Sequence, residues 1–312
     1  MSDERKLIAI GRSRFLYNSI TYLAARGFEF KAIITDHPNE EYDVKPSDFE
    51  ALASKIKTQL FITKNVLLDE ILNLLKKHDI KIAISVNWKY TLPQSFLDLF
   101  ECGILNFHLG NLPDYKGNAT PNWAIINGED YIYGNIHRME PELDSGDVLS
   151  RKSIPITPET YVGDILKQAE TEVPALFEDA IEKALLQPDY FVVKGSQQGL
   201  RCYPRLPDDS QINWQEDLET IYSLVRASSR PFSGAFSYLN GKKVIIWKAR
   251  KLIPPERYLA VPGHVIALKK DSKKTWVACV DGFLELHEIE VDGSVMAPCD
   301  YIKSIRVRFK TI

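Results

Sequence analysis

The sequence predicts an α/β fold, in which a mainly parallel twisted sheet with helices on both faces is followed by a small β-rich domain. Short apolar runs alternate with segments of helical spacing over the first hundred residues, a pattern typical of βαβ crossovers. The apolar runs are continuous, as in strands that are buried on both faces. Beyond residue 211 the chain changes to short β-like runs separated by Gly, Asn-Gly and Asp-Gly.

The first part of the chain supplies the strands and helices of the sheet. "KLIAIG" ends at a glycine, and the helical "YNSITYLAARG" leads into the next buried run. Helices are also expected over 67–79 and, as a short one, from Pro93. The expected strands cover 6–11, 30–36, 60–63, 80–86 and 103–109. In such Rossmann-like sheets ligands bind beyond the carboxyl ends of the strands, so the residues at these ends are candidates for a site.

The rest of the chain divides into three parts. A loop, a helix over 119–127, the strands "YIYGNIHRM" and "VLSRKSIPI" and a long helix over 160–186 complete a first domain of residues 1–193. Residues 194–211 are rich in Gly, Pro and polar side chains, which predicts a linker. A helix over 216–229 and the short β runs then predict a β-rich, OB-like domain over residues 212–312.

Composition narrows the class of protein. The 312 residues are 45% hydrophobic and 26% charged, which is typical of a globular protein with a filled core. No apolar run approaches the ~20 residues that span a bilayer, and the charged start "MSDERK" does not resemble a signal peptide. We therefore expect a cytoplasmic protein with no membrane partner. The four cysteines are widely spaced, so we expect reduced thiols and no metal site.

The formal net charge of −3 is unevenly distributed. Residues 201–312 hold 18 Lys and Arg against 13 Asp and Glu, a net charge of +5. This charge is weak beside the basic surface that a nucleic-acid-binding protein uses. We therefore expect no nucleic acid partner.

One stretch, "LNFHLGNLPDYKGNATPNWAIING" (105–128), carries candidate chemistry. Asn106 and His108 stand two apart on an expected strand, so their side chains leave from the same face. Asp144 follows later, just before the Ser145-Gly146 turn. The amide can donate to a developing oxyanion, the imidazole can stabilise charge or shuttle a proton, and the carboxylate can orient the imidazole. Taken singly, the same residues also fit a structural pair and a turn.

The stretch from Asn106 to Leu149 resembles the folate-dependent formyltransferases, the family of the glycinamide ribonucleotide and methionyl-tRNA formyltransferases. The family pattern is Asn-x-His, Leu-Pro-x-x-x-Gly, a Trp-containing helix and Asp-x-Gly. Its positions here are Asn106, His108, Leu112, Pro113, Gly117, Trp123, Asp144 and Gly146. The resemblance extends from residue 5 to about 255. Within it, "YPRLPDDSQINW" and "IYSLVRASSRPFSGAFSYL" look like the start of the C-terminal domain in methionyl-tRNA and aminoarabinose formyltransferases.

The resemblance implies N10-formyltetrahydrofolate as the formyl donor and no metal. By matching position, "NWKYTLP" lines the pteridine pocket, and "HRMEPELD" closes over it largely through backbone groups. The implied cofactor-binding residues are Trp88, Tyr90, Leu92, His137, Met139, Glu140 and Pro141. The implied catalytic residues are Asn106, His108 and Asp144.

The formyl acceptors known for this family are a glycinamide ribonucleotide, charged initiator tRNA, water and amino sugars on nucleotide diphosphates. The chain is longer than the single-domain glycinamide ribonucleotide enzymes, and it reads "GRSRFLYNS" where they carry a Gly/Ser-rich phosphate loop. It starts directly at the first strand, where the hydrolase relatives usually have a regulatory segment. The acidic "DHPNEEYDVKPSD" and the low net charge count against tRNA. We therefore expect a sugar nucleotide N-formyltransferase, with methionyl-tRNA formyltransferase as the alternative.

The acceptor site is expected at two places. The loop after the first strand offers backbone amides and arginines to a diphosphate, and the turn after His108 offers groups for sugar hydroxyls and phosphate. The residues are Gly11, Arg12, Ser13 and Arg14 in the loop, and Asn111, Lys116 and Asn118 in the turn. The sugar enzymes of this family are often homodimers, and we expect a role in O-antigen or lipopolysaccharide biosynthesis. A binding module without activity is a further alternative, against which the intact Asn, His and Asp set counts.

Overall fold

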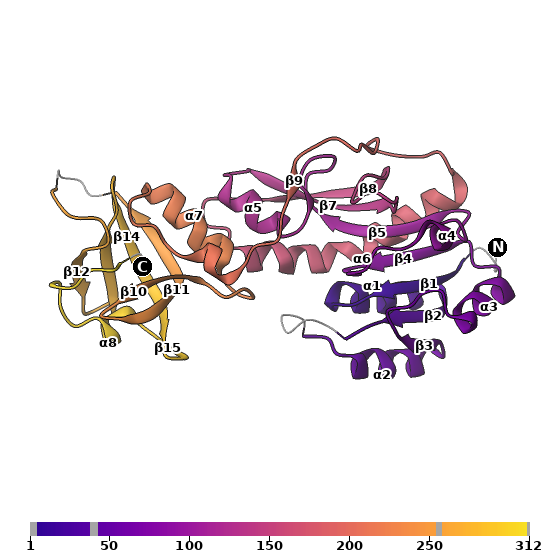
Figure 1. Ribbon diagram of the computed structural model, residues 1–312, viewed down its shortest axis with the longest axis horizontal. Coiled ribbons are helices and arrows are strands. Elements are labelled where there is room, and N and C mark those ends of the chain that lie inside the picture. The colour runs from indigo at the N-terminus through magenta and orange to yellow at the C-terminus, as the bar shows by residue number, and fades with distance from the viewer. Residues whose placement is uncertain (1–4, 38–42, 254–257, 311–312) are drawn as a thin grey trace. The chain divides into compact units, whose positions relative to one another are not determined.

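The computed structural model describes residues 5–37, 43–253 and 258–310 (Figure 1). Residues 38–42, within the acidic segment "DHPNEEYDVKPSD", lie outside the described residues. The chain forms two compact units, and neither is a single stretch of sequence. Unit 1 consists of Met1–Thr120, Tyr131–Pro155 and Leu166–Tyr203, and unit 2 of Pro121–Asp130, Ile156–Ile165 and Pro204–Ile312.

Unit 1 is built on a seven-stranded sheet in the order β3-β2-β1-β4-β5-β7-β8, which can be followed in Figure 1. The strands from β3 to β5 run parallel, whereas β7 is antiparallel to both β5 and β8. The strands are β1 (Lys6–Gly11), β2 (Glu29–Thr35), β3 (Gln59–Ile62), β4 (Ile82–Val86), β5 (Gly103–Leu109), β7 (Tyr131–Arg138) and β8 (Val148–Pro155). Because β7 runs antiparallel to β5, the end of β7 lies beside the first half of β5, where the Met139 N–H donates to the Ile104 carbonyl at 2.8 Å.

Helices cover both faces of this sheet, which explains why its central strands are apolar without alternation. One core cluster joins α3 and α4 to Ile8, Ile10 and Ile34. The intervening side chains of β1, such as Leu7, are equally buried on the opposite face. The helices of unit 1 are α1 (Arg14–Ala24), α2 (Pro46–Ile56), α3 (Asp69–His78), α4 (Gln94–Leu97) and, from Leu166 on, α6 (Val162–Leu186). Among these only α2 is not expected from the sequence.

Unit 2 contains an antiparallel sheet in the order β10-β11-β14-β13-β12, with β15 paired to β14. Its core consists of the apolar side chains of these strands and of α7, whose N-cap Asp217 accepts the Thr220 N–H. The elements are α7 (Leu218–Ser228), β10 (Ala235–Leu239), β11 (Lys242–Leu252), β12 (Val265–Lys269), β13 (Lys274–Ala278), β14 (Phe283–Val291), β15 (Ser294–Met296), α8 (Pro298–Tyr301) and the 3-10 helix η2 (Pro207–Ser210). A mainly parallel sheet with helices, followed by a β-rich region, confirms the predicted fold class.

The sequence predicts residues 194–211 as a linker, but the first half of this stretch is bonded to other parts of unit 1. Asp147 accepts the Gly195 N–H at 2.7 Å and pairs with the Lys194 ammonium at 2.8 Å. The short strands β6 (Lys116–Gly117) and β9 (Arg201–Cys202) then pair in parallel. Residues 194–203 therefore lie against the loop that follows β5. We call them the strap.

The two units also do not meet at a single boundary near the predicted residue 193, because two earlier segments of the chain belong to unit 2. Helix α5 (Thr120–Ile126) lies almost wholly in unit 2, as do residues 156–165. The Asn122 side chain, for example, donates to the Ala227 carbonyl at 2.7 Å. In the part of the chain that the structure describes, no helix is long and apolar enough to span a bilayer.

Candidate active site

Strand β5 carries Asn106 and His108 to the place where the parallel part of the sheet meets the antiparallel part. Asn106 stands opposite His137 on β7, and His108 stands opposite Asn135. The side chain of His108 is 7% exposed. Because residues two apart on a strand share a face, the amide and the imidazole lie on the same side of the sheet, as the sequence predicts.

Both ring nitrogens of His108 lie close to polar groups. Its Nε2 lies 2.7 Å from the Tyr115 carbonyl oxygen; since a carbonyl can only accept, Nε2 carries a hydrogen. Its Nδ1 lies 3.3 Å from Oδ2 of Asp144. Burial lowers the pKa of His108, against the opposing influence of the Asp144 carboxylate. Because Nε2 already donates to the carbonyl, Nδ1 is the ring atom that can exchange a proton, and it faces the Asp144 carboxylate.

Asp144 is aimed at this ring by a constrained loop. A Cβ on Gly146 would lie 2.0 Å from the Arg138 carbonyl oxygen, so the loop needs a glycine there. Oδ2 of Asp144 also accepts the Gly117 N–H at 2.8 Å. Burial alone would raise the pKa of the Asp144 carboxyl, but the neighbouring His108 and the Gly117 N–H hold it well below its usual range. Asp144 is thus a fixed negative charge beside His108.

His137 belongs to the same cluster, although the sequence predicts it as a cofactor-binding residue. Its side chain is 2% exposed, and its Nε2 lies 3.2 Å from Nδ2 of Asn106 and 3.5 Å from Oδ1 of Asp144. Its Nδ1 lies 2.8 Å from the Arg138 carbonyl oxygen. The ring therefore sits between the amide and the carboxylate.

Asn135 is a further polar residue of the site that sequence reasoning missed. It is fully buried, and its Nδ2 lies 2.6 Å from the Gly110 carbonyl oxygen and 3.2 Å from that of His108. Both groups are acceptors, so the amide nitrogen faces them. Asn135 thus holds the backbone at the end of β5. Its place opposite His108 depends on the strand register, for which the local sequence gives no signal.

A cavity of about 300 Å³ opens beside the cluster. Trp88 and Tyr90 form part of its wall, with ring centroids 5.3 Å apart at an interplanar angle of 68°. The indole nitrogen of Trp88 is buried and has no partner among the described residues. The cavity is lined by all the residues predicted for the catalytic and cofactor roles: Trp88, Tyr90, Leu92, Asn106, His108, His137, Met139, Glu140, Pro141 and Asp144.

The aromatic wall of the cavity is anchored to the end of β2. The Tyr90 hydroxyl donates to Oδ2 of Asp36 at 2.5 Å, and the Lys89 ammonium lies 3.4 Å from the same oxygen. Burial would raise the pKa of Asp36, but these two neighbours and a backbone hydrogen bond lower it. The carboxylate therefore fixes the segment that carries Trp88 and Tyr90.

The predicted phosphate loop lies next to this cavity without lining it. A Cβ on Gly11 would lie 2.0 Å from the Val86 carbonyl oxygen, which explains the glycine at the end of β1. Arg12 is 4% exposed and its Nε donates to the Asn87 carbonyl at 3.1 Å. The hydroxyl of Ser13 donates to the Asn87 side chain, and Arg14 forms an ion pair with Asp43 at 2.8 Å. Asn87 itself lines the cavity and so connects it with this loop.

The three residues predicted in the turn differ in position. Asn118 lines the cavity. Asn111 binds the backbone of β7, where it accepts the Tyr133 N–H at 3.0 Å. Lys116 is 5% exposed, and its ammonium donates to the carbonyl of Ser196 in the strap. Of the three, only Asn118 thus faces the cavity beside the cluster of Asn106, His108 and Asp144.

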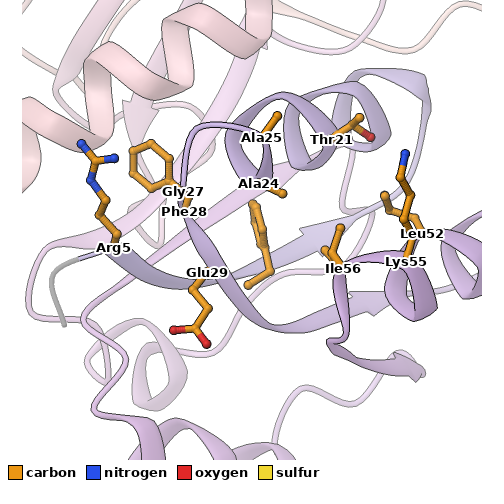
Figure 2. Close-up of a pocket in the computed structure, with 11 residues that line it drawn as sticks. Arg5, Thr21, Ala24, Ala25, Gly27, Phe28, Glu29, Leu52, Lys55 and Ile56 are labelled. Atoms are coloured by element: carbon orange, nitrogen blue, oxygen red, sulfur yellow. The ribbon is translucent and has the colours of Figure 1, made fainter. Parts of the chain in front are cut away.

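A larger cavity of about 660 Å³ lies elsewhere in unit 1, by helices α1 and α2 (Figure 2). Figure 2 shows Arg5 beside the ring of Phe28 at one end and Lys55 at the other. The guanidinium of Arg5 donates to the Arg26 carbonyl at 2.9 Å. None of the predicted site residues lines this cavity. Within the described ranges there is also no group of three or more His, Cys, Asp and Glu side chains that could hold a metal ion.

Comparison with known families gives two matches. Residues 5–181 match the family described as formyl transferase, and residues 206–306 match the formyl transferase C-terminal domain. Together these matches cover the Asn106, His108 and Asp144 cluster and most of unit 2.

Two curated proteins are similar to the chain over most of its length. The bifunctional polymyxin resistance protein ArnA of Wigglesworthia glossinidia brevipalpis is 29% identical over 84% of the chain, which spans only 40% of ArnA. The methionyl-tRNA formyltransferase of Geotalea uraniireducens (strain Rf4) is 28% identical over 92% of the chain and 91% of its own length.

Solved structures share the fold at lower identity. The N-formyltransferase from Helicobacter canadensis, in complex with folinic acid and dTDP-3-aminofucose, has a TM-score of 0.66 at 17% identity, over 90% of this chain and 97% of that one. HypX from Aquifex aeolicus in complex with tetrahydrofolic acid has a TM-score of 0.62 at 18% identity. That match covers 98% of this chain and 50% of HypX.

Proposed function

We propose that this chain, which belongs to the formyl transferase family and is a formyltransferase, is a sugar nucleotide N-formyltransferase. In this proposal it moves a formyl group from N10-formyltetrahydrofolate to the amine of a nucleotide-linked amino sugar. The observation that carries the proposal is the contact between His108 and Asp144 at 3.3 Å, with Asn106 beside them on the wall of one cavity. An inactive binding module would not need this buried charged cluster.

The cavity suits a folate as the donor. Trp88, Tyr90 and Met139 offer flat or flexible apolar surface to a pteridine ring. The segment from Glu140 to Asp144 offers backbone groups to its polar edge. The buried Trp88 indole N–H, which has no partner among the residues that the structure describes, is a further donor. The bound donor would supply an activated formyl group. Folate and related ligands in the Helicobacter and Aquifex structures support the same assignment.

The polar cluster divides the work of acyl transfer among its side chains. The Asn106 amide supplies a hydrogen-bond donor for the oxygen that gains negative charge. The neutral His108 takes the proton of the attacking amine on Nδ1, because its Nε2–H is already bound to the Tyr115 carbonyl. The imidazolium then has the Asp144 carboxylate at 3.3 Å. Proton uptake is thus favoured only while the fixed charge of Asp144 is present.

The charges of unit 2 favour a small acceptor over tRNA. Many of its basic side chains are paired with acidic neighbours, which leaves little net positive field for phosphates. The pairs are Arg230 with Glu288, Lys242 with Asp292, Lys251 with Glu219, Lys273 with Asp300 and Lys274 with Glu285. The dTDP-3-aminofucose of the Helicobacter enzyme is an acceptor of the proposed class.

A screen for the acceptor tests the proposal. The purified chain is incubated with N10-formyltetrahydrofolate and UDP-, dTDP- or GDP-linked amino sugars, and the products are read by mass. We expect one amino sugar to gain a formyl group. Formylation of charged initiator tRNA, with micromolar binding in a gel shift at ~50 mM salt, would instead establish the methionyl-tRNA formyltransferase that the Geotalea relative suggests. Cytoplasmic location, homodimer formation and a role in O-antigen or lipopolysaccharide biosynthesis stay predictions.

A further inference from the structure

We propose that His137 is a positioning residue that fixes the side-chain amide of Asn106 with an N–H directed at the reacting formyl oxygen. This inference rests on the proposed role of Asn106 as the oxyanion donor. His137 and Asn106 stand directly opposite each other in the antiparallel β5–β7 pair, so their side chains meet on one face of the sheet. Nε2 of His137 and Nδ2 of Asn106 are 3.2 Å apart.

The hydrogen bond to Arg138 decides which nitrogen of His137 accepts. Nδ1 lies 2.8 Å from the Arg138 carbonyl oxygen, and a carbonyl has no hydrogen to give. Nδ1 therefore carries a hydrogen, and in the tautomer with its single hydrogen there, Nε2 presents a lone pair. That lone pair accepts one hydrogen of the Asn106 amide.

The same lone pair excludes the opposite orientation of the amide. A rotation that exchanges Oδ1 and Nδ2 of Asn106 would bring an oxygen lone pair against Nε2 of His137, which is repulsive at hydrogen-bond distance. Asn106 lines the cavity, and its amide has no other hydrogen-bond partner among the described residues. The second amide hydrogen is thus the one that the donor's formyl oxygen can meet.

Among the described residues, Asp144 and His108 also face His137. Oδ1 of Asp144 lies 3.5 Å from Nε2, and the rings of His108 and His137 have centroids 6.4 Å apart at 83°. Neither replaces the amide of Asn106 as the partner of the neutral Nε2, because a carboxylate oxygen cannot donate to it. His137 therefore acts on the reaction through Asn106.

The variants His137→Leu and His137→Gln separate this role from packing. Leucine fills the buried position but offers no acceptor, so kcat should fall by about 10- to 100-fold, less than the loss from deleting an oxyanion donor. The Michaelis constants of both substrates should change by less than about threefold. Glutamine offers its Oε1 as an acceptor and should restore at least about half of the lost activity on a logarithmic scale. Ile136→Val, a mild truncation on the opposite face of β7, is the matched control and should keep its activity.

A double variant links the effect to Asn106. In the Asn106→Ala background, His137→Leu should change kcat by less than about twofold, because residues that act as a unit are non-additive. Full additivity, or equal loss in the leucine and glutamine variants, would refute the positioning role. If Asn106→Ala itself kept normal turnover, the proposed catalytic assignment would fail. If only His137→Leu kept normal turnover, the failure would be confined to His137.

A measurement on the unchanged chain does not depend on how the variants fold. In protein labelled with ¹⁵N-histidine, the neutral His137 ring should carry its hydrogen on Nδ1, and Nε2 should show the shift of an acceptor nitrogen. A ring with its hydrogen on Nε2 would overturn the proposal, because it could not accept from the Asn106 amide.

Discussion

Replacement of Asp144 by asparagine removes one charge from the site and keeps its shape. The Oδ2 position can remain an oxygen, which accepts the Gly117 N–H at 2.8 Å as the carboxylate does. The loop should therefore stay in place. What is lost is the charge 3.3 Å from Nδ1 of His108. At an effective dielectric constant of about 20, the attraction between the carboxylate and a protonated His108 amounts to about 5 kcal/mol. This energy sets an upper limit on the loss of rate of between about 10³- and 10⁴-fold.

We expect kcat of Asp144→Asn to fall by about 10²- to 10³-fold, below this limit because the variant keeps the other contacts of the site. The assay is single-turnover formylation of the accepted amino sugar, with the melting temperature as the control for folding. Turnover within about fivefold of the unchanged enzyme, in a folded variant, would refute the reasoning, since the imidazolium would then need no carboxylate.

Three further predictions concern the loop, the aromatic wall and the pH. Gly146→Ala forces a Cβ to within 2.0 Å of the Arg138 carbonyl oxygen, so urea unfolding should show a loss of about 1–3 kcal/mol together with a loss of activity. Tyr90→Phe removes the hydroxyl that donates a hydrogen bond to Asp36 at 2.5 Å. The variant should lose about 1 kcal/mol of unfolding free energy, and its Michaelis constant should rise more for the folate than for the sugar nucleotide. Because burial lowers the pKa of His108, the unfolded chain binds this proton more readily. The free energy of unfolding should therefore fall as the pH drops below about 6.5, and His108→Gln should weaken that dependence in urea titrations at several pH values.

Much of unit 1 can be predicted from its sequence because its strands are continuous apolar runs that end at Gly or polar residues. The expected strand over 103–109 coincides with β5, and the spacing of Asn106 and His108 then places both side chains on one face. Helix α1 begins at Arg14, three residues before the expected start at residue 17. Local pattern locates an element well and its ends less well.

The remaining features depend on pairing between distant segments. Asn135 reads as an ordinary position of a β run, and the family resemblance implies His137 only as a cofactor-binding residue. The β5–β7 register is what brings these residues opposite His108 and Asn106. The Gly-rich, polar strap likewise reads as part of a linker, because its partners, such as Asp147, lie far away in the sequence. A polar, glycine-rich composition indicates an irregular backbone, and it carries no information on whether that backbone is hydrogen-bonded elsewhere.

The turn after β5 and the loop after β7 bring together residues that are far apart in the sequence. The chain leaves β5 at Leu109, runs through α5 and returns antiparallel along β7, which sets His137 beside Asn106. The glycine-dependent loop after β7 then turns back, so that Asp144 reaches both His108 and the Gly117 N–H. One carboxylate thus connects β5, the turn at Gly117 and its own loop at the point where the proposed reaction takes up a proton. A shift in any of them would move the charge away from Nδ1 of His108, so the proposed mechanism requires that Asp144 be held rigidly.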